Sequence, residues 1–225
     1  MILRYLKYQL ISACVVIMSC NSIEEPIAMP GTSYYPLEMG KYITYSVTEY
    51  SHDAFLEKTD TTYFWQKEIL EDTFNDISGS LVYKMGISIS KDSGKNWIFN
   101  SFAIVEKDNN SGIRTENNTR KTILGFPFRE LKTWDVNALN VQDKKLARVK
   151  NLEKSVTTIL GKQFAKSVLI DLGNQLDPIL TNIENEVYAE GLGLIERKYS
   201  YIETQPGKYK SGIEYIKTIY ETNWE

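Results

Sequence analysis

The chain has 225 residues, which is long enough to fold by burying an apolar core without disulfides. It carries 26 lysines and arginines against 29 aspartates and glutamates, a net charge of −3. This balance, without any long basic run, excludes a nucleic-acid partner, because nucleic-acid binding requires a clustered basic face.

The first 19 residues predict a secretory signal peptide. Arg4 and Lys7 form a positive start, and residues 10–18 form an apolar run. That run is too short to span a bilayer, which takes ~20 apolar residues, but it suits the apolar region of a signal peptide. Residues 17–20, Ile-Met-Ser-Cys, resemble a lipobox, so we expect cleavage after residue 19 and lipid attachment at Cys20.

A rival lipobox, Ile-Ser-Ala-Cys, occupies residues 11–14 and ends at Cys14. Cleavage there would leave a leader with no uninterrupted apolar core, so Cys20 is favoured. An ordinary signal peptide followed by a chance cysteine remains the alternative. With Cys14 removed and Cys20 acylated, the folded domain has no free thiol, which excludes cysteine nucleophiles.

Residues 20–33 are predicted to be the lipidated cysteine and a flexible tether, since they are rich in proline, glycine and small polar residues. The acidic pair Glu24-Glu25 resembles the surface-export signal of Bacteroidetes lipoproteins. We therefore expect an exported protein, anchored by lipid to the outer membrane, with the leaflet left open. Its expected partners are the membrane, through the lipid at Cys20, and the lipoprotein processing machinery.

Residues 34–225 are predicted to form a single antiparallel β domain, because their dominant period is two. In Leu81–Ser90, for example, Tyr83, Met85 and Ile87 lie on one face, as a half-buried strand requires. Glycine- and asparagine-rich turns separate the apolar runs and suit hairpins. Strands are expected at residues 41–50, 61–69, 81–90, 97–105, 156–160, 163–172, 192–201 and 210–220.

The predicted fold is all-β: a curved antiparallel meander that forms a half-barrel, a barrel or a two-layer sandwich. At most one or two short helices are expected. Residues 143–154 form the candidate helix, although they fit a strand almost as well. Two weak repeats, 35–41 with 126–132 and 82–86 with 187–191, leave open either two similar halves or recurring turn chemistry.

Two segments resemble uncharacterised Bacteroidetes lipoproteins. Residues 34–45 resemble their opening strand, which has the sequence pattern Tyr-x-Pro-Leu-x-x-Gly, and residues 188–195 resemble their later Gly-x-Gly strand. Ile43 stands where these proteins often carry tryptophan. The resemblance covers both ends of the domain, but its motifs are structural and transfer no catalytic residue.

Residues 90–97 resemble an Asp-box, the turn motif of sialidase propellers. Ser90 and Asp92 are expected to hydrogen-bond the loop backbone, Gly94 to adopt a positive φ, and Trp97 to pack beneath. Propellers carry several such boxes and this chain carries one. We therefore predict a structural hairpin turn.

No residue set predicts catalysis, a metal site or a cofactor. His52 is the only histidine, and its polar surroundings predict an exposed loop residue rather than a member of a triad. One histidine and no free thiol also exclude the usual zinc sites. Glu184 and Glu186 would share one face of a strand. We favour the interpretation that they are solvated charges on an edge strand, and a glycosidase pair is the alternative.

The leading hypothesis is a non-catalytic, lipid-anchored envelope protein. The second is a carrier of lipid or another hydrophobic ligand, built as a half-barrel, and a dry, filled interior would exclude it. The third is a glycan-binding module or carboxylate hydrolase. It is suggested by the Glu184/Glu186 pair and by seven tyrosines that could form a surface for stacking on a ligand. We favour the simpler interpretation that these tyrosines occupy ordinary strand positions. They are Tyr42, Tyr50, Tyr199, Tyr201, Tyr209, Tyr215 and Tyr220.

Overall fold

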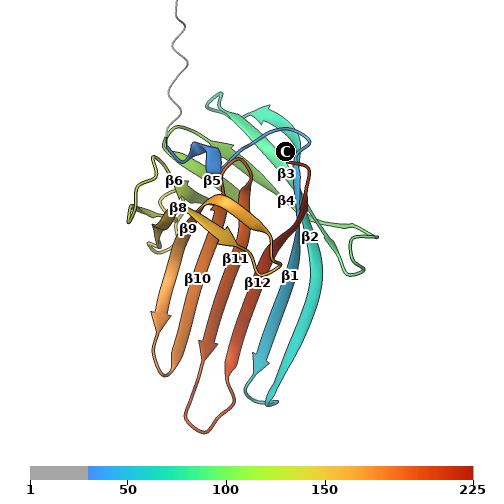
Figure 1. Cartoon of the computed structure of the whole chain (residues 1–225), viewed down its shortest axis with the longest axis vertical. Helices are drawn as coiled ribbons and strands as arrows, with labels where there is room; N and C mark the ends of the chain where they lie inside the picture. Colours follow the sequence, from blue (N-terminus) through green and yellow to red (C-terminus); the bar gives the residue numbers. More distant parts are fainter. Residues whose placement is uncertain (1–29, 225) are drawn as a thin grey trace, which may run out of the picture.

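The computed structural model describes residues 30–224 as one sheet of twelve antiparallel strands that curls into a nearly closed barrel (Figure 1). Consecutive strands pair from β1 to β6 and from β7 to β12, and β1 also pairs with β12, so β6 and β7 are the two ends of the sheet. The strands are β1 (Tyr42–Asp53), β2 (Lys58–Asn75), β3 (Leu81–Ser90), β4 (Ile98–Lys107), β5 (Ser111–Glu116), β6 (Thr119–Gly125), β7 (Thr133–Asp135), β8 (Leu146–Thr157), β9 (Gln163–Leu176), β10 (Leu180–Ala189), β11 (Gly193–Glu203) and β12 (Ser211–Thr222).

The barrel nearly closes between β6 and β7, the two end strands of the sheet. The backbone N–H of Thr122 donates to the carbonyl of Val136 at 2.9 Å. The indole N–H of Trp134 donates to the carbonyl of Thr122, also at 2.9 Å. Because β7 has only three residues, these few bonds join the two halves of the meander on this side.

The all-β prediction is confirmed, and of its three alternatives the structure adopts the barrel. The strand expected at 81–90 has the same bounds as β3, while the expected strand at 156–160 ends at Thr157. The candidate helix at 143–154 is wrong, because residues from 146 onward form β8. A 3₁₀ turn, η1 (Thr32–Tyr34), is the helical element among the described residues. No helix in residues 30–224 has the length and apolarity needed to cross a membrane.

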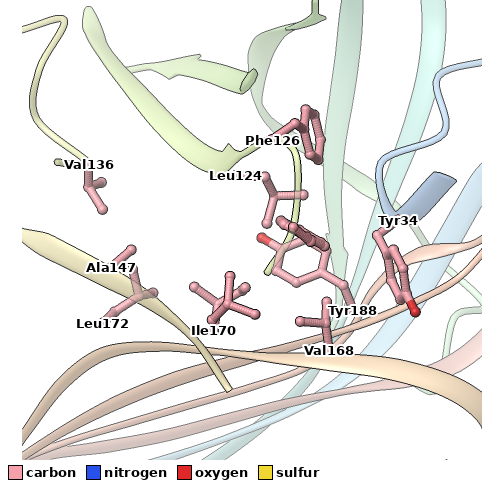
Figure 2. Packing of buried hydrophobic residues seen from close by; sticks show 11 residues of the cluster. Tyr34, Leu124, Phe126, Val136, Ala147, Val168, Ile170, Leu172 and Tyr188 are labelled. Atoms are coloured by element: carbon pink, nitrogen blue, oxygen red, sulfur yellow. The ribbon is translucent and has the colours of Figure 1, made fainter. Parts of the chain in front are cut away.

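An apolar cluster fills the end of the barrel at which the chain enters (Figure 2). Tyr34, from η1, contacts Phe128 with ring centroids 5.6 Å apart. Val168 and Ile170 of β9 and Tyr188 of β10 belong to the same cluster and are fully or almost fully buried. The segment that precedes β1 therefore packs across this end of the barrel.

Candidate functional site

A cavity of about 450 Å³ lies in the lumen, the interior of the barrel. Tyr35, Pro36 and Leu37, which follow η1, form part of its wall. The Tyr35 hydroxyl donates to the Ile113 carbonyl at 3.4 Å, and a Cβ on Gly112 would stand 2.8 Å from the Tyr35 ring. The absence of a side chain at position 112 thus lets the ring seat inside the barrel.

Charged side chains make up much of the cavity wall. Inward-facing positions of β2, β5, β6, β10, β11 and β12 carry them, together with the segments before β1 and β8. The cavity wall includes Lys41, Glu68, Arg114, Glu116, Lys121, Lys145, Glu184, Glu186, Arg197 and Lys217.

Glu68 holds together the first of two ion-pair networks in the cavity. Its Oε1 lies 2.7 Å from Lys217 Nζ and 3.3 Å from a terminal nitrogen of Arg114. Gln66 donates a further hydrogen bond to the same oxygen at 2.8 Å. Lys217 also lies over the ring of Tyr45, with Nζ 4.0 Å from the centroid. Glu68 and Lys217 are 8% and 5% exposed, so solvent screens this pair little.

One carboxylate therefore pairs with two cations, the buried Lys217 and the half-buried Arg114. Burial alone would raise the pKa of Glu68, but the charges of Lys217 and Arg114 and their hydrogen bonds lower it to about 2. Burial lowers the pKa of Lys217, and the positive charges of Arg114 and Arg197 lower it further against the opposing effect of Glu68. The network holds Glu68 ionised, and Arg114 also pairs with Glu116 at 2.9 Å.

Glu184 and Glu186 form the second network with Arg197. Arg197 donates to Glu184 at 2.7 Å, and Lys145 pairs with the same carboxylate. The Tyr188 hydroxyl donates to Glu186 at 2.7 Å. Burial would raise the pKa of Glu184, but the charges of Arg197 and Lys145 and their hydrogen bonds hold it below its usual value.

The prediction of solvated edge-strand charges is wrong for Glu184 and Glu186. Strand β10 lies inside the sheet, between β9 and β11, and both side chains are buried against the cavity. Two carboxylates thus do share a cavity. The sequence interpretation also missed Lys217. This lysine shares one face of its strand with Tyr215 and Ile219, at a position where a half-buried strand would place an apolar residue.

The Asp-box-like segment forms the β3–β4 turn, away from the cavity wall. Ser90 Oγ donates to Asp92 Oδ1 at 2.6 Å and accepts from the Gly94 N–H at 3.0 Å. Gly94 has a φ of +80°, and a Cβ there would lie 3.3 Å from the Trp97 ring. Hydrogen bonds, first from Ser90 and then from Asn96, lower the pKa of Asp92 to about 2.

The prediction that His52 is an exposed loop residue is wrong. His52 lies in β1, is 7% exposed, and bridges two other strands. Its Nε2 is 2.9 Å from Glu214 Oε1 of β12, and its Nδ1 is 2.6 Å from Thr59 Oγ1 of β2. Thr59 in turn contacts the Tyr209 hydroxyl at 2.8 Å. These contacts join strands that the sequence separates by 162 residues, and they lie outside the cavity wall.

The tyrosines do not form one common surface. Tyr199 and Tyr215 are directly opposite each other on β11 and β12, in the rows that also carry Arg197 and Lys217. Tyr201 continues the same row of β11. Tyr50, by contrast, is opposite Glu214 and lies on the other face of the sheet. Only part of the tyrosine set therefore borders the lumen.

The predicted lipid-attachment residue, Cys20, lies outside the described residues, as does the predicted signal peptide. Residues 30–33, at the end of the predicted tether, pack on the barrel: the Phe128 N–H donates to the Pro30 carbonyl at 2.8 Å. In residues 30–224 no group of three histidine, cysteine, aspartate or glutamate residues could hold a metal ion.

No known protein family matches the chain, and no curated protein matches its sequence. Solved structures that match include a candidate lipoprotein from Parabacteroides distasonis, with 11% identity and a TM-score of 0.46 over 88% of this chain and 100% of that one. Another is a candidate exported protein with a YmcC-like fold from Bacteroides fragilis, with 11% identity and a TM-score of 0.42 over 84% of this chain and 97% of that one.

Proposed function

We propose that this chain is a non-catalytic, lipid-anchored protein of the cell envelope that binds a small ligand inside its barrel. The observation that supports it is the cavity of about 450 Å³ in the lumen, within the usual size range of small-molecule sites. The lipobox-like residues before Cys20 support the anchor. A filled interior would have excluded a carrier, and this interior is not filled.

The ionised state of two cavity carboxylates, Glu68 and Glu184, supports binding rather than hydrolysis. A glycosidase pair requires one carboxyl that keeps its proton near neutral pH, which means a raised pKa. The pKa of Glu68 and that of Glu184 are both lowered by neighbouring cations. Glu184 and Glu186 are further tied to the same arginine, Arg197. We therefore assign these groups to ligand recognition and to the stability of the lumen.

The wall composition supports a ligand with both polar and apolar parts. Apolar side chains share the cavity with the charged ones, so a purely hydrocarbon ligand would remove solvent from the charged groups without offering them a hydrogen bond. The apolar part of the wall includes Ile43, Leu70, Met85, Val105, Ile123 and Leu172. This departs from the hydrophobic-ligand carrier suggested by the sequence and favours an amphiphilic ligand.

Filling the cavity should remove bound ligand. Thr119 lies on the cavity wall in the short strand β6, so Thr119→Trp should reduce ligand occupancy at least about tenfold by occupying the space the ligand needs. Occupancy is measured by extracting small molecules from protein purified from membranes and quantifying them by mass spectrometry.

The matched control is Thr61→Trp, an exposed position on β2 away from the cavity wall. It should keep the wild-type content of extracted molecules. If no small molecule is enriched in the wild-type protein relative to Thr119→Trp, the binding role is wrong.

The anchor is tested separately at Cys20. Inhibiting the lipoprotein signal peptidase should make the unprocessed precursor accumulate, and mass spectrometry of the mature N-terminus should find acyl chains on Cys20. In Cys20→Ser the acyl mass should disappear and the protein should leave the membrane fraction. An unmodified N-terminus at another residue would contradict the assignment.

A further inference from the structure

We infer that the ligand of the barrel is a small amphiphilic anion, whose carboxylate, phosphate or similar oxyanion lies among the basic residues of the lumen. This inference rests on the proposed ligand-binding function. Six basic side chains and four carboxylates line the cavity, so the lining has a formal excess of positive charge. A negatively charged group is the ligand chemistry that this excess favours.

The basic residues are arranged in two like-charged pairs. Arg114 of β5 is directly opposite Lys121 of β6, and Arg197 of β11 is directly opposite Lys217 of β12. All four line the cavity. Like charges at directly opposed positions destabilise a sheet. Burial lowers the pKa of Lys217, and the charges of Arg114 and, to a smaller extent, Arg197 lower it further. An anion between the pairs would offset the repulsion.

Each of the four cavity carboxylates already pairs with a cation. Within residues 30–224, two N–H donors of the cavity nevertheless remain without an acceptor. The exposed side chain of Lys121 has no hydrogen-bond or ion-pair partner among the described residues. The buried Nε of Arg197 has no hydrogen-bond acceptor, although Glu186 lies 3.5 Å away. These two donors belong to different like-charged pairs, and both residues line the cavity. They provide charge-assisted hydrogen bonds for an oxyanion.

The remainder of the ligand has an apolar surface to contact. Ile43, Met85 and Val105 are buried residues from three strands, and Ile123 lies next to Lys121 on β6. A molecule with one anionic end and a short hydrocarbon or ring portion would thus satisfy the basic residues and bury apolar area at once.

The test compares two probes that differ in charge, 4-phenylbutyrate and the neutral 4-phenylbutanol. The mature protein, purified from membranes and placed in zwitterionic nanodiscs, is titrated with each probe by calorimetry, with empty nanodiscs as the blank. We expect the anion to bind at least about tenfold more tightly than the alcohol. Raising salt from about 0.05 to about 0.5 M should weaken binding of the anion much more than that of the alcohol.

Charge reversal at Lys121 assigns the preference to the cavity. Lys121→Glu is a solvent-accessible change on a side chain without a partner, so the protein should fold normally, which thermal unfolding checks. It should reduce affinity for 4-phenylbutyrate about tenfold and leave 4-phenylbutanol unchanged. Lys91→Glu, an exposed lysine in the β3–β4 turn away from the cavity wall, should change neither.

The outcomes separate this inference from the function on which it rests. If the alcohol binds as tightly as the anion, or if Lys121→Glu weakens both probes equally, the barrel binds ligands but the anion assignment is overturned. If neither probe binds in a way that Thr119→Trp abolishes, and no extracted molecule is found, ligand binding itself is wrong.

Discussion

Replacing Glu68 by glutamine should lower the free energy of unfolding by about 3–5 kcal/mol, because it leaves the buried Lys217 without a counter-ion and removes one of the two carboxylates that pair with Arg114. Lys217 and Arg114 both contact Glu68 Oε1, at 2.7 and 3.3 Å, and a neutral amide cannot balance their charges. The loss is measured by urea denaturation followed by tryptophan fluorescence. This is the largest effect that we expect from a single substitution in the lumen.

Two matched variants check the cause. Glu71→Gln changes an exposed carboxylate of the same strand, 3.7 Å from Lys84, and should alter stability by less than about 0.5 kcal/mol. The double variant Glu68→Leu/Lys217→Met removes both members of the buried pair and should recover most of the stability, since Arg114 keeps Glu116 at 2.9 Å. A double variant as unstable as Glu68→Gln would show that packing, and not unpaired charge, causes the loss.

The pH dependence follows from the same contact. The pKa of Glu68 is about 2 in the folded chain against a usual value of 4.5, so its contribution is fully present above about pH 4.5. It is lost as the pH falls through about 2, and its size is on the order of 3 kcal/mol. The stability difference between the wild type and the Glu68→Leu/Lys217→Met variant should therefore shift against the wild type on acidification over this range. A difference independent of pH would contradict the ionised state of Glu68.

Replacing Gly212 by alanine should cost about 2–4 kcal/mol, because the added carbon would collide with the main chain of β11. A Cβ at this position would lie 1.9 Å from the Tyr201 carbonyl oxygen, and the glycine has a φ of +131°. A backbone carbonyl held in a ladder cannot move aside as a flexible side chain can. Strands β11 and β12 would have to separate next to His52, which is opposite Gly212 on β1.

Gly207→Ala is the control for backbone strain alone. Gly207 has a φ of +74°, and no atom lies within 4 Å of the position that a Cβ would take, so alanine there meets strain but no collision. We expect a loss of about 1 kcal/mol, visible as a smaller shift of the urea midpoint. Equal losses at the two positions would show that the close approach of Tyr201 is relieved at little cost.

Several strands were predictable because one of their faces is apolar. In β3 the inward row includes Met85 and Ile87, and alternation with polar residues reveals both the strand and its orientation. Strand β10 was predicted only as an edge strand, without bounds, for the opposite reason. Its inward row includes Glu184 and Glu186, so the lumen side of the strand is charged and the apolar alternation is absent.

The short strands β5 and β6 escaped prediction for the same reason. Their inward positions include Arg114 and Lys121, which face the cavity rather than an apolar core. The charged residues that line the lumen are thus the ones that interrupt the apolar alternation by which its strands would be recognised. Periodicity reveals a buried face only where that face is apolar, and here buried positions carry ion pairs.

By itself the sequence determined the all-β class, the antiparallel hairpins and the turn residues, because these depend on neighbours within a few positions of one another. The tertiary structure alone decided that the sheet closes into a barrel, that His52 is buried, and that Glu68 meets Lys217. The reason is that β1 pairs with β12, so partners lie some 150 residues apart, as Glu68 and Lys217 do. Local periodicity does not indicate which distant strand will pair with a given strand, and the ion pairs of the lumen form only through that pairing.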